Sequence, residues 1–264
     1  IWIVFGSIFA GGVHDYMSGM ISVRHDGKSL APLIEKYLGK RIKGLFLIFM
    51  ILFLLLLGAV FAMSPAHMLA DISHTPFVGW IIAIFAYYFL ATLLPIDKII
   101  GRFYPLFALL LIGVSVAMLI VLFISGQEFY PDLTFSNQHP KNLPIFPLMF
   151  VTIACGAISG FHATPLMARC LANEKFGRPI FYGAMITEGI VALIWATLGI
   201  AYYQGSQGLN EIIEAAGPGG VVSGVANGYL GHIGGIMAII SVVVLSITSG
   251  DTAFRSARLA IGDY

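Results

Sequence analysis

Apolar residues fill long stretches of this chain, and polar residues gather in the short segments between them. Seven stretches are long enough to cross a bilayer, which takes about 20 helical residues for a ~30 Å hydrocarbon core. They cover residues 1–23, 44–63, 78–96, 104–124, 143–163, 179–203 and 229–248. The pattern predicts an all-α polytopic membrane protein whose residues 1–264 form a single transmembrane domain with seven transmembrane helices.

The composition supports this fold class and excludes several others. Of the 264 residues, 58% are hydrophobic and only 10% are charged, and the mean hydropathy is +0.91. A formal net charge of +1 leaves no basic face for a nucleic acid. Cys155 and Cys170 are the only cysteines, so neither a disulfide framework nor a zinc site is indicated. We expect no metal site and no cofactor.

The basic residues alternate between the connections and so predict an orientation. Thirteen of the fourteen Lys and Arg residues fall in connections that the positive-inside rule places in the cytoplasm, and Lys141 alone faces outward. The first of these connections, residues 24–43, carries apolar residues at helical spacing among its basic residues. This arrangement favours a short helix on the inner membrane surface, where anionic headgroups attract it, over an ordinary solvated loop. In the outer connection, residues 204–228, we expect one or two helical turns.

The stretch from residue 149 to residue 175 predicts a broken helix. It starts as an uncharged apolar helix and loosens around Gly156–Gly160 before a polar run. Freed backbone groups are tolerated in a membrane only where protein or a water-filled cavity satisfies them, and such breaks line the sites of many transporters. The alternative is that Gly156 and Gly160, spaced as GxxxG, only let another helix approach. The predicted substrate-binding residues are Gly156, Ser159, Gly160, His162 and Thr164.

Ionisable residues interrupt three of the apolar stretches. His14 and Asp15 lie in the first, Glu188 lies in the sixth, and His162 follows the predicted break. Their distances in sequence from the nearest inner basic residue place all of them near the middle of the membrane, which favours one shared polar site. Charges there are costly, so each is a candidate for coupling an ion to transport. The alternative is a structural role in tying helices together.

The seventh stretch ends with hydroxyl residues beside a glycine and Asp251. Ser246, Thr248 and Ser249 predict a small-cation site built from hydroxyl and freed carbonyl oxygens. The alternative is a helix end at which Asp251 pairs with Arg255.

Four strings, taken together, resemble the carbon starvation protein A (CstA) family. They are FAGGVHDYMSGMISVRHDGKSL, LPIDKIIGRFYPLF, FVTIACGAISGFHATPLMARCLANE and ITSGDTAFRSARL, which begin at residues 9, 94, 150 and 247. The resemblance implies a carbon-starvation peptide transporter of the bacterial inner membrane, with close relatives that import pyruvate with protons. It also implies an inverted-repeat bundle of the APC/LeuT-like kind, in which the first stretch is core helix two, the stretch at residues 143–163 is core helix six and the stretch at residues 229–248 is core helix eight. Asp15 and Glu188 would then lie on repeat-related helices two and seven.

Two features depart from that family pattern. Family members carry a segment with a GHH string ahead of this region, and here Pro165 follows Thr164 directly where relatives have a longer polar turn. Because the chain starts at Ile1 in apolar sequence, we expect a piece of a larger protein, without the first core helix and the C-terminal segments.

The expected function is secondary active import of peptides, coupled to protons, and the chain is not expected to be an enzyme. The alternative is symport of pyruvate or another small carboxylate with protons. A remote alternative is a membrane oxidoreductase that holds haem between His14 and His162. The expected partners are a small-molecule substrate, a proton or sodium ion and membrane lipid.

Overall fold

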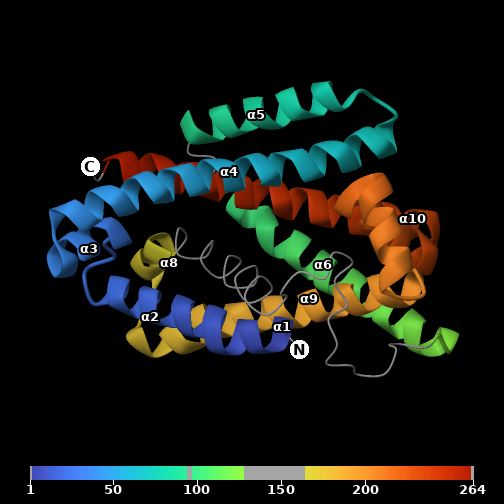
Figure 1. Cartoon of the computed structure of the whole chain (residues 1–264), viewed down its shortest axis with the longest axis horizontal. Helices are drawn as coiled ribbons and strands as arrows, with labels where there is room; N and C mark the ends of the chain where they lie inside the picture. The colour runs from blue at the N-terminus through green and yellow to red at the C-terminus, as the bar shows by residue number, and fades with distance from the viewer. Residues whose placement is uncertain (1, 94–96, 128–163, 263–264) are drawn as a thin grey trace. The chain divides into compact units, whose positions relative to one another are not determined.

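The computed structural model describes residues 2–93, 97–127 and 164–262, and every element in them is a helix. This confirms the predicted all-α fold class. The elements, shown in Figure 1, are α1 (Trp2–Phe5), η1 (Gly6–Gly11), α2 (Gly12–Val23), α3 (Leu30–Leu38), α4 (Lys40–Ser73), α5 (Phe77–Leu93), α6 (Asp97–Ser125), α8 (Thr164–Cys170), η2 (Glu174–Phe176), η3 (Arg178–Tyr182), α9 (Gly183–Tyr202) and α10 (Ser206–Gly262).

Within these ranges, four helices are long and apolar enough to cross a membrane: Lys40–Ser73, Pro105–Ser125, Glu174–Tyr202 and Ser206–Leu259. A shorter apolar helix, Phe77–Ala91, matches a further predicted segment, and residues 2–23 form one unbroken helical run. The predicted helix at residues 143–163 lies outside the described residues.

Helix α4 is longer than the sequence indicates, because it continues past residue 63 through Pro65 to Ser73. A proline removes the N–H that would bond to the carbonyl four residues earlier, here that of Phe61. The hydroxyl of Tyr88 on α5 donates to this carbonyl at 3.5 Å, and Tyr88 is buried. A side chain of the neighbouring helix thus supplies the donor that the proline removes, and α4 crosses the proline without ending.

Helix α10 replaces what the sequence indicates as a glycine-rich outer connection. It begins at Ser206 and has non-helical backbone only at Gly217 (φ 67, ψ −177) and Gly231 (φ 66, ψ −174), which divide it into three helical parts. The one or two helical turns expected in the outer connection lie in the first part. The third part continues to Gly262, so the alternative of a helix end beside Asp251 is wrong.

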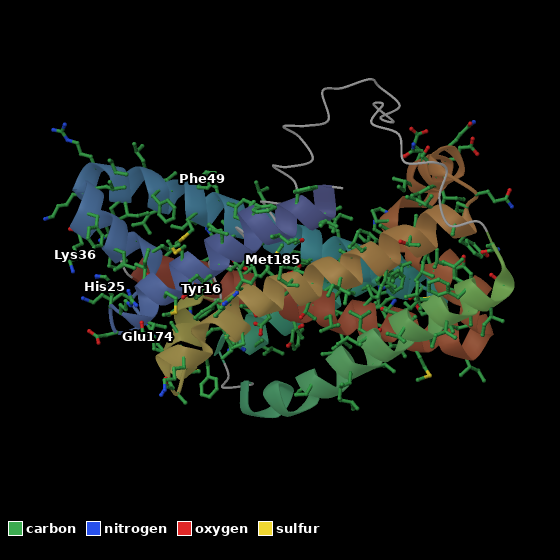
Figure 2. The ribbon with its side chains drawn as sticks, turned by 90° about the horizontal axis from the view of Figure 1, so that it is seen from below. Tyr16, His25, Lys36, Phe49, Glu174 and Met185 are labelled. Atoms are coloured by element: carbon green, nitrogen blue, oxygen red, sulfur yellow. The ribbon has the colours of Figure 1, made fainter. Side chains whose placement is uncertain are left out.

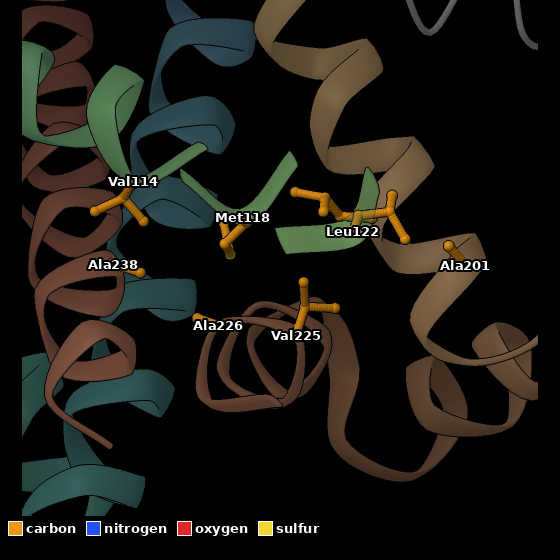
Figure 3. Packing of buried hydrophobic residues seen from close by; sticks show 8 residues of the cluster. Val114, Met118, Leu122, Ala201, Val225, Ala226 and Ala238 are labelled. Carbon is orange, nitrogen blue, oxygen red and sulfur yellow. The ribbon is translucent and has the colours of Figure 1, made fainter. Parts of the chain in front are cut away.

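The chain divides into two compact units, and each has its own apolar core. In unit 2 (residues 59–138 and 191–251), α6, α9 and α10 bury Val114, Met118, Leu122, Leu198, Ala201, Val225, Ala226 and Ala238 (Figure 3). Ser115 lies beside this cluster and accepts a hydrogen bond from the indole N–H of Trp195 at 2.9 Å.

Unit 1 (residues 1–58, 139–190 and 252–264) holds the polar residues of the first and sixth predicted segments. Its largest apolar cluster joins α3, the start of α4 and the end of α10 through Ala31, Leu47, Met50, Leu54, Ala253 and Ala257. A second cluster joins α2, α8 and η3 through Met20, Ala168 and Phe181. The second cluster fixes α2 against η3.

Candidate functional site

Two helical runs of unit 1 lie side by side and antiparallel, residues 2–23 and residues 174–190 (Figures 1 and 2). At one end, the sulfur of Met20 packs directly against Gly177. At the other end, the hydroxyl of Ser7 occupies the space beside Gly189, 2.6 Å from where a Cβ would lie. Residue numbers therefore rise along one run in the direction in which they fall along the other. This is the antiparallel order that the predicted topology requires of the first and sixth segments.

Small residues form the contact surface between these runs. The ring of Phe181 lies 2.6 Å from the position of a Cβ on Gly19, and the ring of Tyr182 lies 2.8 Å from that on Gly12. Any larger residue at these glycines would collide with an aromatic ring. Close approach through glycine is the usual way in which membrane helices associate, since lipid offers no hydrophobic driving force between them.

Both runs contain a π-helical segment, η1 in the first and η3 in the second. The two segments are joined, because the hydroxyl of Tyr182, the last residue of η3, donates to the carbonyl of Ile8 in η1 at 3.3 Å. A π-helical segment widens the helix and is often found at functional sites. In a membrane, each backbone group that it displaces needs a partner, and Tyr182 provides one across the helix pair.

Asp15 lies on the helix face that meets the second run. Gly12, Asp15 and Gly19 are spaced as i, i+3 and i+7, so the carboxylate projects from the same side as the two contact glycines. The Asp15 side chain is 16% exposed, and its Oδ1 lies 3.1 Å from Nδ1 of His14, which is 35% exposed. A partly buried carboxylate with a histidine neighbour therefore lies on the contact face.

Glu188 lies next to the contact glycine Gly189 on the second run. The residue is exposed on the surface of the described chain, and its carboxylate is close enough to Asp15 for the two charges to act on each other. In the part of the chain that the structure describes, no Lys, Arg or His lies within ion-pair distance of Glu188. A carboxylate facing lipid would be costly, so an exposed one on a spanning helix indicates a polar cavity or another helix in front of it.

The structure thus places Asp15, with its neighbour His14, and Glu188 on two facing runs. That these residues share one site stays a prediction. Gly156, Ser159, Gly160 and His162 lie outside the described residues, so the broken helix and the place of His162 stay predictions. Thr164 begins α8, and its side chain also lies outside what the structure describes.

The predicted cation site lies within a helix. Ser246, Thr248 and Ser249 belong to the third part of α10, and the hydroxyl of Thr248 donates to the carbonyl of Leu245 at 2.8 Å. The backbone here is helical, so the freed carbonyl oxygens that the sequence suggests do not occur at these residues. A cation site built on the hydroxyl groups stays a prediction.

Sequence reasoning did not find the residues that shape the helix contact: Ser7, Ile8, Gly12, Gly19, Tyr182 and Gly189. The seven-residue spacing of Gly12 and Gly19, with Asp15 between them, was the signal that could have revealed the contact face. Nothing in the sequence marks the two π-helical segments beyond nearby glycines and Pro179.

The inner ends of the two runs are joined by charged and polar contacts. Nε of Arg24 donates to Oε1 of Glu174 at 2.7 Å, and Nε of Arg169 donates to the carbonyl of Gly27 at 3.0 Å. Gly27 has φ +70, and the aliphatic part of Arg169 packs directly against it. Two connections that the positive-inside rule assigns to the cytoplasm therefore meet at one end of the helix pair. This is expected if both connections lie on the same side of the membrane.

The described residues contain no group of three His, Cys, Asp or Glu side chains that could hold a metal ion. The haem alternative stays untested because His162 lies outside them.

Comparison with protein families gives one match, to the family model described as carbon starvation protein CstA, over residues 1–78 and 66–206. Among similar curated proteins, an uncharacterized membrane protein of Haemophilus influenzae is 42% identical over 270 residues, covering 81% of this chain and 73% of that protein. No solved structure matches the chain significantly.

Two other relatives have names that describe transport. A peptide transporter CstA of Helicobacter pylori (strain J99) is 28% identical over 263 residues, and a pyruvate/proton symporter BtsT of Escherichia coli K12 is 27% identical over 260 residues. Each match covers 74% of this chain but only 38% and 36% of the respective relative, so the chain spans less than two fifths of their length. These names agree with the expectation that the chain is not an enzyme.

Proposed function

The chain belongs to the carbon starvation protein CstA family, and from this premise we propose that it is part of a secondary active transporter that imports peptides with protons. Family and helices together make it a multi-pass protein of the bacterial inner membrane. The observation that carries the proposal is the Asp15 and Glu188 pair on two antiparallel helices. Carboxylates inside membrane helices are the usual carriers of protons in transporters.

The pair has the parts that proton coupling needs. Asp15 has a histidine partner at 3.1 Å and little exposure, whereas Glu188 is exposed and has no cation among the described residues. The two carboxylates differ in environment and sense each other's charge, so protonation of one changes the free energy of ionising the other. In this proposal, Glu188 exchanges protons with the cavity and Asp15 responds through the helix contact.

The same helices support the proposed inverted-repeat architecture. Each run has a π-helical segment shortly before its carboxylate: η1 ends at Gly11 before Asp15, and η3 ends at Tyr182 before Glu188. Matching irregularities at matching places are expected of repeat-related helices two and seven in an APC/LeuT-like bundle.

A second candidate substrate class is pyruvate or another small carboxylate. The relative named as a pyruvate/proton symporter favours it, at an identity close to that of the named peptide transporter. Both candidates keep the proton-coupling role of the carboxylate pair and differ only in the substrate.

Uptake by membrane vesicles that contain the full-length protein tests the proposal. Labelled dipeptide and labelled pyruvate are offered separately, each with and without an inward pH gradient. Accumulation of dipeptide that requires the gradient supports the proposal, and accumulation of pyruvate alone selects the second candidate. Uptake of either substrate that ignores the pH gradient but follows a sodium gradient would reject proton coupling.

A further inference from the structure

The end of α3 and the start of α4 form an exposed surface that combines basic and apolar side chains. Lys36, Lys40 and Arg41 are exposed, and between them lie Tyr37, Leu38 and Ile42, which are 62%, 60% and 45% exposed. We call these six residues the α3–α4 patch. It belongs to the first connection, which the charge pattern assigns to the cytoplasmic face.

The opposite side of α3 is fixed to the protein. Ala31 is fully buried and packs in a cluster with Leu47 of α4 and Ala257 of α10. The chain then turns from α3 into α4 at Gly39, whose φ of +91 is open to glycine and strained for other residues. The patch is therefore a defined corner between a short helix and a spanning helix, with one face packed and the other open.

Hydrogen bonds hold part of the patch in place. His25 Nδ1 lies 2.9 Å from the carbonyl of Ile21 and donates to it, so His25 Nε2 is the acceptor for its other neighbours. The Lys36 ammonium lies 3.2 Å from this nitrogen and 5.4 Å over the ring of Tyr37, and the Tyr37 hydroxyl lies 3.0 Å from it. His25 and Lys36 lie close together in Figure 2.

Nearby acidic residues leave the patch basic. Glu35 lies beside the patch, but Nζ of Lys43 donates a hydrogen bond to Oε2 of Glu35 at 2.8 Å. This hydrogen bond lowers the pKa of Glu35. Lys43 is outside the patch, so the negative charge of Glu35 is balanced by a lysine other than Lys36 or Lys40. The patch keeps three basic side chains that a negatively charged partner can approach.

We propose that the α3–α4 patch binds the headgroup of an anionic phospholipid in the inner leaflet. Lys36, Lys40 and Arg41 contact the phosphate, and the apolar side chains reach toward the acyl chains. Tyrosine suits such a boundary because its ring is apolar and its hydroxyl is polar. Basic residues next to exposed apolar ones at the foot of a spanning helix are the features by which helices recognise anionic membrane surfaces. The proposal does not depend on the transported substrate.

Lipid binding to the purified full-length protein in neutral detergent tests this. Fluorescent phosphatidylglycerol and phosphatidylcholine are titrated separately at low ionic strength, and the apparent Kd is measured for each. We expect tighter binding of phosphatidylglycerol, and loss of this preference in Lys36→Gln/Lys40→Gln/Arg41→Gln, with an affinity drop on the order of a hundredfold for three basic residues.

Matched variants separate the patch from general charge effects. Lys36→Arg/Lys40→Arg/Arg41→Lys keeps the charge and should keep the preference, and Lys28→Gln/Lys175→Gln removes exposed basic residues elsewhere and should also keep it. A single Lys40→Gln variant should show an intermediate loss if the triple variant does not fold. Unchanged preference in both glutamine variants of the patch would overturn the proposal. Displacement of phosphatidylglycerol by millimolar inorganic phosphate would do so as well, because it would indicate a site for soluble anions.

Discussion

Two glycines, one three residues before Asp15 and one four residues after it, determine which helix packs against the face that carries this carboxylate. Gly12 and Gly19 let the rings of Tyr182 and Phe181 approach the helix, so the helix face that carries Asp15 meets the second run. Glu188, beside Gly189 on the second run, is exposed in the part of the chain that the structure describes. The two carboxylates therefore have different surroundings although both lie in membrane helices, and the difference gives each a distinct expected phenotype.

Replacing Glu188 by Gln tests the coupling role. Glutamine keeps the size and hydrogen-bonding capacity of the side chain but does not titrate, so accumulation driven by a pH gradient should be lost while substrate exchange across the membrane survives. The measurement is vesicle uptake with and without the gradient, compared with counterflow of preloaded substrate. Glu214→Gln, a matched change at an exposed position in the first part of α10, should leave both intact. Gradient-driven accumulation at the parent level in Glu188→Gln would assign the coupling role elsewhere, with Asp15 the next candidate.

Removing the hydroxyl of Tyr182 tests the link between the two π-helical segments. Tyr182→Phe leaves the ring against Gly12 but takes the donor from the carbonyl of Ile8, which should cost about 1–2 kcal/mol of folding free energy. Thermal unfolding of the purified protein measures this cost. Tyr16→Phe is the control, since the Tyr16 hydroxyl makes no hydrogen bond to a described residue, and its unfolding temperature should stay at the parent value. Equal stability of Tyr182→Phe and the parent would show that water or another group serves Ile8.

Among the elements, α10 shows most clearly how backbone conformation overrides composition. Its Gly-rich start reads as a loop in the sequence, yet it is helical on both sides of Gly217 and again after Gly231. Both glycines adopt nearly the same positive φ with an extended ψ, a conformation essentially restricted to glycine. Outside its own local backbone, neither has an atom of the described residues within 4 Å of the place that a Cβ would take, so a substitution there would strain the backbone without a collision with them.

Replacing Gly217 or Gly231 by Ala should therefore destabilise the protein through the backbone alone, by about 1–3 kcal/mol at each site. Gly79→Ala is a matched control, because Gly79 also has open space around it but lies in α5 without a positive φ. Alanine should be neutral or slightly stabilising there. Unfolding of the three purified variants in the same detergent compares them. If Gly79→Ala were destabilised while Gly217→Ala and Gly231→Ala were unaffected, the positive φ of Gly217 and Gly231 would be contradicted.

The sequence predicted the helices well where their length and apolar content determine the structure. It predicted them poorly where a single residue determines whether a helix continues. The short helix at Leu30–Leu38 follows its apolar spacing, and the spanning segments follow their hydropathy. The continuation of α4 through Pro65 depends on the hydroxyl of Tyr88, which lies 23 residues further on, and no local pattern contains it. Likewise, sequence depth alone placed Asp15 and Glu188 together, whereas the glycine contacts and π-helical segments around them arise only when two distant runs pack.

At the scale of the whole molecule, charge and packing in unit 1 point in the same direction. The connection after α2 and the connection before η3 meet through Arg24 and Glu174, and the basic end of α10 packs near the start of α4 through Ala257 and Leu47. The exposed ion pair itself adds little stability. What matters is that basic connections far apart in sequence gather at one end of the unit, so a single orientation places all of them on the cytoplasmic side.

Cysteine accessibility tests this orientation. In a background without Cys155 and Cys170, of which Cys170 is exposed, single cysteines are introduced at Lys40, Arg178 and Lys141. An impermeant thiol reagent added to intact cells should label the cysteine at position 141 and leave those at positions 40 and 178 unlabelled, because the charge pattern places the last two in the cytoplasm. Opening the cells should make all three react, which shows that an unlabelled site is shielded by the membrane and not by the fold. Labelling of Arg178→Cys in intact cells would mean that the helix pair has the opposite orientation. Arg24 would then also lie on the outer face, because it pairs with Glu174, four residues before Arg178.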